Sequence, residues 1–108
     1  MFALGRMQVR VHDAFVVKYD AQAQKGLPMH SDQSHYSLTI ALNPLSDYEA
    51  GGTFFEALGH AVRPEQGQVV SFPGALCHRG DPITSGFRYI IAAFLYIADE
   101  DVTAASQR

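Results

Sequence analysis

The sequence has few of the features that mark secreted, membrane or nucleic-acid-binding proteins. It contains one cysteine, Cys77, in 108 residues, so no disulfide can form within the chain. No run approaches the ~20 apolar residues that a membrane-spanning helix needs, and no signal-peptide pattern stands at the start. These absences make a cytoplasmic protein without a membrane partner the default expectation.

Positive charge is also scarce. Lys and Arg number 8 against 11 Asp and Glu, which gives a formal net charge of −3 and a pI near 5.9. The basic residues are scattered, whereas a nucleic-acid-binding surface gathers them into a patch or stripe. We therefore expect no nucleic-acid partner. The length predicts one domain, residues 1–108, in which the small and charged residues 99–108 form a frayed tail.

What the sequence does contain is a series of short β-type runs separated by turns. Residues 8–12 and 15–19 predict two strands broken at Asp13, and residues 20–28 predict a loop. Further β-type runs follow at 35–43, 53–55, 60–63, 68–72 and 87–97. About eight strands without a strong amphipathic helix predict an all-β fold, a sandwich or barrel such as a jelly roll.

The run from His35 to Asn43 alternates most clearly. Its apolar face carries Tyr36, Leu38, Ile40 and Leu42, and its other face carries small and polar residues. A period of two is typical of a strand with unlike faces. We expect the apolar face to lie in the core.

Two metal-binding residue types lie two positions apart in Met29-His30-Ser31-Asp32. On an extended segment such positions point to the same side, so His30 and Asp32 can reach one ion. A second imidazole would complete the 2-His-1-carboxylate triad that holds non-haem Fe(II) and leaves positions open. His78 is the candidate, because a jelly roll brings distant strands to one interior. We expect no ligand role for the remaining histidines, His12, His35 and His60.

Arg88 follows His78 by ten positions, near the start of the long apolar run. On a strand it would share its side with Ile90, Ala92 and Phe94, so an inward Arg88 would be a cation in an apolar pocket. Such a charge is costly unless an anion pairs with it. A guanidinium can bind a carboxylate through two parallel hydrogen bonds, so a bound dicarboxylate would supply the partner.

These residues stand in a wider pattern of motifs: VVKYD, HSD, TIALN, GGTFF, GQVVSFPG and GFRYIIAAFLY. Together they resemble the Fe(II)- and 2-oxoglutarate-dependent dioxygenases of the prolyl and lysyl hydroxylase type, from Val16 to Ile97. The resemblance implies a double-stranded β-helix (jelly roll). It also implies that His30, Asp32 and His78 bind Fe(II), and that Arg88 binds the distal carboxylate of 2-oxoglutarate.

The resemblance implies further partners of the site. O2 would be the second co-substrate, ascorbate would keep the iron reduced, and succinate and CO2 would be co-products. Tyr19 matches a pocket-lining tyrosine. Some relatives place another tyrosine where Ala41 stands, so Thr39, Tyr19 or water would supply its hydroxyl.

The substrate implied is a protein, a peptide or a small molecule, hydroxylated at a C–H bond, with a peptidyl prolyl or lysyl side chain as the first expectation. Arginine at position 88 resembles lysyl hydroxylases and oxygen-sensing prolyl hydroxylases more than collagen prolyl hydroxylases.

The resemblance also implies helices ahead of the barrel that brace its outer sheet. Few residues precede the Val16 strand, so these helices are expected to be missing. An exposed apolar sheet face and a tendency to form homo-oligomers would follow. Two alternatives to an enzyme stay open: a non-catalytic cupin-like module that binds a metal or a partner, and an interaction domain braced by another chain. Arg88 favours the enzyme, because a structural metal site has no use for a carboxylate clamp.

Overall fold

The computed structural model describes residues 7–99, which contain eight β-strands and a short 3-10 helix but no α-helix. The elements are β1 (Met7–Asp20), β2 (Tyr36–Ala41), η2 (Leu45–Asp47), β3 (Tyr48–Ala50), β4 (Thr53–Phe55), β5 (His60–Val62), β6 (Val69–Pro73), β7 (His78–Gly80) and β8 (Ile83–Asp99). The all-β prediction is confirmed. Within this range, no helix is long and apolar enough to cross a membrane. The predicted tail, residues 99–108, lies outside the described residues except for Asp99.

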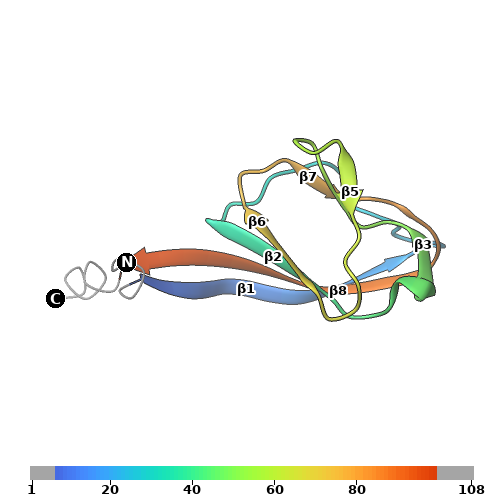
Figure 1. Cartoon of the computed structure of the whole chain (residues 1–108), viewed down its shortest axis with the longest axis horizontal. Coiled ribbons are helices and arrows are strands. Elements are labelled where there is room, and N and C mark those ends of the chain that lie inside the picture. The colour runs from blue at the N-terminus through green and yellow to red at the C-terminus, as the bar shows by residue number, and fades with distance from the viewer. Residues whose placement is uncertain (1–6, 100–108) are drawn as a thin grey trace.

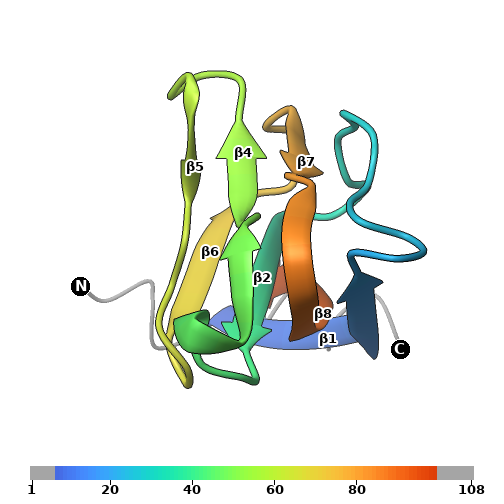
Figure 2. The ribbon, with the colours of Figure 1, turned by 90° about the vertical axis from the view of Figure 1, so that its right-hand side faces the viewer.

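Two antiparallel sheets form the walls of the molecule. The large sheet has the strand order β1-β8-β2-β6, and β3 pairs with the early part of β8. The small sheet has the order β5-β4-β7. Figures 1 and 2 show the small sheet standing over the large one, with chain-distant strands side by side. This two-sheet arrangement is the one expected of a jelly roll.

The first strand differs from its prediction. Instead of two strands broken at Asp13, β1 runs without interruption along β8, with a register shift between Val11 and Asp13. His12 is the extra residue at this shift, which is therefore a β-bulge. The polar residues at 12 and 13 mark a bulge rather than a strand end, because hydrogen bonding to the long β8 continues on both sides of them.

The alternation predicted for β2 is confirmed, but the prediction of its buried face was wrong. Ser37 and Thr39 are 3% and 8% exposed, whereas Tyr36 and Leu42 are 43% and 36% exposed. The interior beside β2 is a pocket with polar groups, so the small and hydroxyl-bearing side chains point inward. The apolar side chains lie on the outer face of the large sheet.

That outer face carries further exposed aliphatic side chains. Val9, Val11 and Val16 of β1 and Val69 of β6 are each more than half exposed. Their pairing registers place them on the same side of the sheet as Tyr36 and Leu42. The exposed apolar sheet face expected from the sequence is present, while the self-association expected from it stays a prediction.

The longest strands extend beyond the rest of the barrel. Pairing between β2 and β8 reaches Leu95, and the following residues of β8 pair with β1 alone. Residues 7–10 and 96–99 thus form a two-stranded ribbon, here called the arm, which projects from the barrel in Figure 1.

Candidate metal centre

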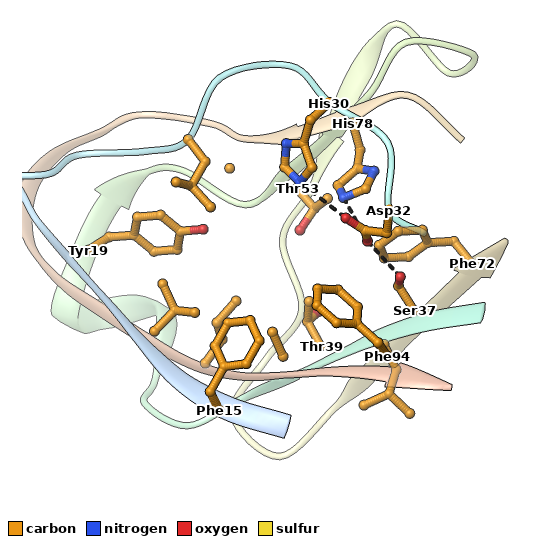
Figure 3. A pocket seen from close by; sticks show the side chains of 16 residues that line it. Phe15, Tyr19, His30, Asp32, Ser37, Thr39, Thr53, Phe72, His78 and Phe94 are labelled. Carbon is orange, nitrogen blue, oxygen red and sulfur yellow. Dashed lines mark hydrogen bonds and ion pairs between the residues drawn. The ribbon is translucent and has the colours of Figure 1, made fainter. Parts of the chain in front are cut away.

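His30, Asp32 and His78 meet in the space between the two sheets. His30 and His78 form an isolated antiparallel bridge in which each backbone N–H donates to the other's carbonyl, both at 2.8 Å. The N–H of Asp32 donates to the carbonyl of Gly74 at 2.8 Å. These backbone bonds hold the predicted ligand segment against β7 and against the turn that follows β6, and Figure 3 shows the three side chains pointing toward one another.

The three side chains offer ligand atoms that all lie within 4.8 Å of one another. His30 Nε2 is 3.3 Å from Asp32 Oδ1, and His78 Nε2 is 3.3 Å from Asp32 Oδ2. Two imidazoles and one carboxylate are a donor set that suits Fe(II). The sequence-predicted triad is therefore brought together by the fold.

Both imidazoles are oriented by backbone carbonyls. His30 Nδ1 lies 2.7 Å from the carbonyl oxygen of Pro28, and His78 Nδ1 lies 2.7 Å from that of Leu76. A carbonyl only accepts, so a neutral imidazole in either position carries its proton on Nδ1 and donates there. Each Nε2 is then left with a free lone pair directed at the gap, as a metal ligand requires.

The carboxylate of Asp32 is held by a serine that the sequence reasoning missed. Ser37 donates a 2.6 Å hydrogen bond to Asp32 Oδ2, and its hydroxyl lies 3.0 Å from that of Ser34. The alternation of β2 could have suggested Ser37, because it shares a face with Thr39. The inverted assignment of that face hid the signal.

A cavity of about 140 Å³ adjoins the three ligand residues. Aromatic and aliphatic side chains form most of its wall, among them Phe15, Phe72 and Phe94 (Figure 3). Four hydroxyl-bearing residues also line it: Tyr19 and Thr39, both predicted, and Ser37 and Thr53, which were not. The hydroxyl of Thr39 is buried without a hydrogen-bond partner, as a polar group that awaits a ligand would be.

Arg88 is a buried charged residue near the cavity, with 2% of its surface exposed. One guanidinium nitrogen, Nη1, donates to the carbonyl of Gly52 at 3.1 Å, whereas Nη2 has no partner. Its guanidinium carbon lies 5.2 Å from the ring centroid of Tyr19, which pairs with Arg88 across β1 and β8. Arg88 itself does not line the cavity, but it packs against Tyr19, which does.

Burial perturbs both members of this pair. It lowers the pKa of Arg88, an effect that the neighbouring Tyr19 and Tyr48 oppose. It raises the pKa of Tyr19, and the charge of Arg88 partly offsets that rise. A buried guanidinium with one unpaired nitrogen is stabilised by any carboxylate that reaches it, because the anion replaces the lost hydration.

The other histidines lie apart from the cluster. The rings of His12 and His35 contact Tyr96, and His60 Nδ1 lies 3.3 Å from the carbonyl of Ala61. Their positions agree with the expectation that they are not ligands of this centre.

Comparison with known proteins shows which chains this one resembles. No protein-family model matches the chain. The rat (Rattus norvegicus) procollagen-lysine,2-oxoglutarate 5-dioxygenase 1 is 42% identical over 86 residues, which cover 76% of this chain and 12% of that protein. The procollagen lysyl hydroxylase and glycosyltransferase of Acanthamoeba polyphaga mimivirus is 45% identical over 92 residues, covering 76% and 10%. The chain thus spans about a tenth of the length of these relatives.

Solved structures share the fold. A 2OG-Fe(II) oxygenase-family oxidoreductase from Burkholderia pseudomallei aligns with a TM-score of 0.69 at 17% identity, covering 83% of this chain and 46% of that one. The viral collagen prolyl hydroxylase of Paramecium Bursaria Chlorella virus-1 aligns with a TM-score of 0.62 at 19% identity, covering 82% and 60%. At these identities the likeness concerns the fold, and it confirms the predicted jelly roll. By sequence and fold together, the chain belongs to the 2-oxoglutarate- and Fe(II)-dependent oxygenases, as a relative of the procollagen lysyl hydroxylases.

Proposed function

We propose that this domain is a hydroxylase that binds Fe(II) through His30, Asp32 and His78 and binds 2-oxoglutarate with the help of Arg88. The observation that carries the proposal is the cluster of three ligand atoms within 4.8 Å, next to a cavity. A 2-His-1-carboxylate set occupies one face of the metal and leaves the opposite face for co-substrate and oxygen. The rat relative is itself named a 2-oxoglutarate dioxygenase.

The protein itself positions the metal-binding atoms. In the neutral form of each histidine, the carbonyls of Pro28 and Leu76 favour the tautomer with the proton on Nδ1, which leaves Nε2 available to a metal, and Ser37 holds one oxygen of Asp32. When bound, Fe(II) with 2-oxoglutarate and O2 supplies the oxidising chemistry, which yields succinate and CO2 beside the hydroxylated product. Ascorbate would serve as the reductant that keeps the iron in its Fe(II) state.

Arg88 and the hydroxyl groups would receive the co-substrate. The unpaired Nη2 of Arg88 and the unpaired hydroxyl of Thr39 are the two buried side-chain polar atoms without a partner in the described part of the chain. An unpaired buried polar group costs stability until a ligand satisfies it. A carboxylate end of 2-oxoglutarate offers acceptors for the guanidinium, for the Thr39 hydroxyl and for the hydroxyl of Tyr19.

The aromatic wall would protect the reacting groups from water. The ring of Phe72 packs 4.7 Å from that of His78, centroid to centroid, and the ring of Phe55 packs 4.8 Å from that of Phe72. Phe15 and Phe94 close another part of the cavity. A dry wall limits side reactions of a strong oxidant with solvent.

The proposed substrate is a lysyl or prolyl side chain within a polypeptide. The names of the relatives, which are procollagen lysyl hydroxylases, support the lysyl choice. The alternative is a non-catalytic metal-binding module of the same fold. The guanidinium of Arg88, with its unpaired Nη2, argues for the enzyme, because a metal-only site gains nothing from a buried cation in this position.

An anaerobic titration tests the proposal. Fe(II) and then 2-oxoglutarate are added to the purified protein while the visible absorption band expected for 2-oxoglutarate chelated to iron is followed. We expect the band in wild-type protein, its loss in His30→Ala, and its retention in His60→Ala, a matched control away from the cluster. Metal binding without a band in wild-type protein would favour the binding module instead.

A further inference from the structure

Three consecutive residues with positive φ angles lead from β3 into β4. Ala50, Gly51 and Gly52 have φ angles of 61°, 80° and 98°. They follow the register shift after which Ala50 pairs with Ile83 at the start of β8. We call residues 50–52 the strap. Ala50 is not a glycine, so its left-handed backbone costs free energy and persists only where neighbouring groups hold it.

The strap holds the guanidinium of Arg88 through one backbone carbonyl. Arg88 Nη1 donates to the carbonyl oxygen of Gly52 at 3.1 Å, and the N–H of Asp81 donates to the same oxygen at 2.8 Å. A guanidinium is planar, so a fixed Nη1 restricts the directions in which the unpaired Nη2 can point. The position of the strap therefore bears on how Arg88 meets a carboxylate.

The strap is packed closely on both sides. A Cβ atom at Gly51 would lie 2.6 Å from Cγ2 of Ile83. A Cβ atom at Gly52 would lie 2.6 Å from the carbonyl oxygen of Val62 and 2.7 Å from Cγ of Arg63. Only glycine fits at these two positions, because both the backbone conformation and the space exclude a side chain. Ile83 thus backs the strap on one side, and the end of β5 with Arg63 covers it on the other.

Arg63 ties the strap from the protein surface. Its Nε donates to the carbonyl of Ala50 at 3.0 Å, and its guanidinium carbon lies 5.5 Å from the ring centroid of Tyr48. Arg63 is exposed, whereas Tyr48 is buried in the core. The hydrogen bond goes to the strap residue that is not a glycine. It is therefore placed where it stabilises the least favourable backbone conformation of the strap.

Charge alone does not account for Arg63 in this position. Burial lowers the pKa of Arg88, the neighbouring Tyr19 and Tyr48 oppose this effect, and the like charge of Arg63 adds to it. A second cation is unfavourable beside an arginine that stays charged in order to bind a carboxylate. The hydrogen bond to the strap is a favourable contribution that offsets this repulsion.

We infer that Arg63 is a positioning residue for the co-substrate: its hydrogen bond to Ala50 holds the strap, and the strap orients Arg88 toward the carboxylate of 2-oxoglutarate. This inference rests on the proposed hydroxylase function. Arg63 acts only through the strap and Arg88, and it contacts none of the three metal-ligand residues. Its loss should therefore weaken co-substrate binding and leave metal affinity unchanged.

Two substitutions at position 63 separate the hydrogen bond from the charge. The amide nitrogen of glutamine is the same number of bonds from Cα as Nε of arginine, so Arg63→Gln keeps a donor there and removes the charge. Arg63→Met keeps a stem of similar length without donor or charge. Calorimetric titration of Mn(II)-loaded protein with 2-oxoglutarate should give a Kd roughly three- to tenfold higher in Arg63→Met than in wild type. Arg63→Gln should bind nearly as wild type does, and the Mn(II) affinity should be equal in all three proteins.

A second measurement needs neither metal nor co-substrate. The N–H of Asp81 is bonded to the carbonyl of Gly52, so its hydrogen exchange, followed by NMR, reports on the strap directly. We expect faster exchange at Asp81 in Arg63→Met than in wild type, and exchange close to that of wild type in Arg63→Gln.

Arg10→Met is the matched control. It also replaces an exposed arginine by methionine, but Arg10 pairs with Tyr96 near the end of β8, whereas the strap pairs with Ile83 at its start. This variant should change neither the Kd for 2-oxoglutarate nor exchange at Asp81.

Three results would overturn the inference. The first is an equal Kd for 2-oxoglutarate in wild type and Arg63→Met. The second is an equal weakening in Arg63→Met and Arg63→Gln, which would assign the effect to charge. The third is unchanged exchange at Asp81 in Arg63→Met, which would break the link between Arg63 and the strap. Wild-type protein that binds Mn(II) but no 2-oxoglutarate would instead refute the hydroxylase proposal, and exchange at Asp81 would then still decide whether Arg63 holds the strap.

Discussion

Ser37 is expected to control the metal affinity of the site. It is 3% exposed, and the side chain of Asp32 is 7% exposed, so the 2.6 Å hydrogen bond between them is shielded from water. The bond engages Oδ2 of Asp32 and leaves Oδ1 as the oxygen available to an ion. In Ser37→Ala the carboxylate loses this restraint and can rotate, so part of the metal-binding free energy is spent on ordering it.

The size of the effect follows from the kind of bond. A hydrogen bond to a charged group contributes about 1.5–3 kcal/mol, and each 1.4 kcal/mol corresponds to a factor of ten in an equilibrium constant. Ser37→Ala should therefore weaken metal binding about 10- to 100-fold, which is also the usual cost of losing a hydrogen-bond partner of a metal ligand. The lower end applies if a water molecule or Ser34 replaces the lost donor.

Isothermal titration with Mn(II), an oxygen-stable substitute for Fe(II), measures this affinity directly. Ser37→Thr keeps the hydroxyl and should retain binding close to that of wild type. Ser71→Ala, on the outer side of β6, is the control for loss of a serine elsewhere in the large sheet. An unchanged Mn(II) affinity in Ser37→Ala would refute the reasoning, provided that the wild-type protein binds the ion.

Three further predictions concern the cavity. Arg88→Ala should raise the Kd for 2-oxoglutarate at least roughly 30-fold, because a buried charge-assisted pair is lost. The Kd of Arg88→Lys should lie between those of wild type and Arg88→Ala. Equal affinity in all three proteins would exclude Arg88 as the residue that binds the carboxylate of 2-oxoglutarate. Thr39→Val removes a buried hydroxyl that has no hydrogen-bond partner, and the valine side chain costs about 1–3 kcal/mol less to bury than the threonine side chain. We therefore expect a higher unfolding temperature for the ligand-free variant and weaker 2-oxoglutarate binding. A lower unfolding temperature would contradict this reasoning. Burial raises the pKa of Tyr19, so the folded state favours the neutral phenol, and its contribution to the free energy of unfolding is full below about pH 10 and is lost as the pH rises further. Denaturant titrations between about pH 8 and about pH 11, a range around the ordinary pKa of tyrosine, measure the free energy of unfolding. As the pH rises, this free energy should fall less in Tyr19→Phe than in wild type. An identical fall in both proteins would contradict the role given to the buried Tyr19 phenol.

The candidate centre was largely predictable because its ligands carry a strong local pattern. His30 and Asp32 lie two positions apart on an extended segment, and the motifs around His78 and Arg88 resemble one family. Ser37 and Thr53 carry no such pattern, since a lone serine or threonine in a strand is common. Only the contact of Ser37 with Asp32 reveals its part in the site.

The two errors about strands have one physical origin. A period of two in β2 indicates that the two faces of the strand differ, but hydrophobicity alone does not distinguish a polar face that meets solvent from one that lines a polar cavity. In β1, polar residues at 12 and 13 suggested a break, yet the ladder with β8 continues through a bulge. Both outcomes depend on what lies opposite the strand, which is information that a single segment does not contain.

By itself, then, the sequence determined the all-β class, the approximate strand pattern and the identity of the three residues that form the candidate metal cluster, because these follow from local periodicity and short motifs. The tertiary structure decided which face of β2 meets the cavity, that β1 and β8 extend as an arm, and that Asp32 is held by Ser37. These features arise only when strands far apart in the chain pair and bring their side chains within contact distance.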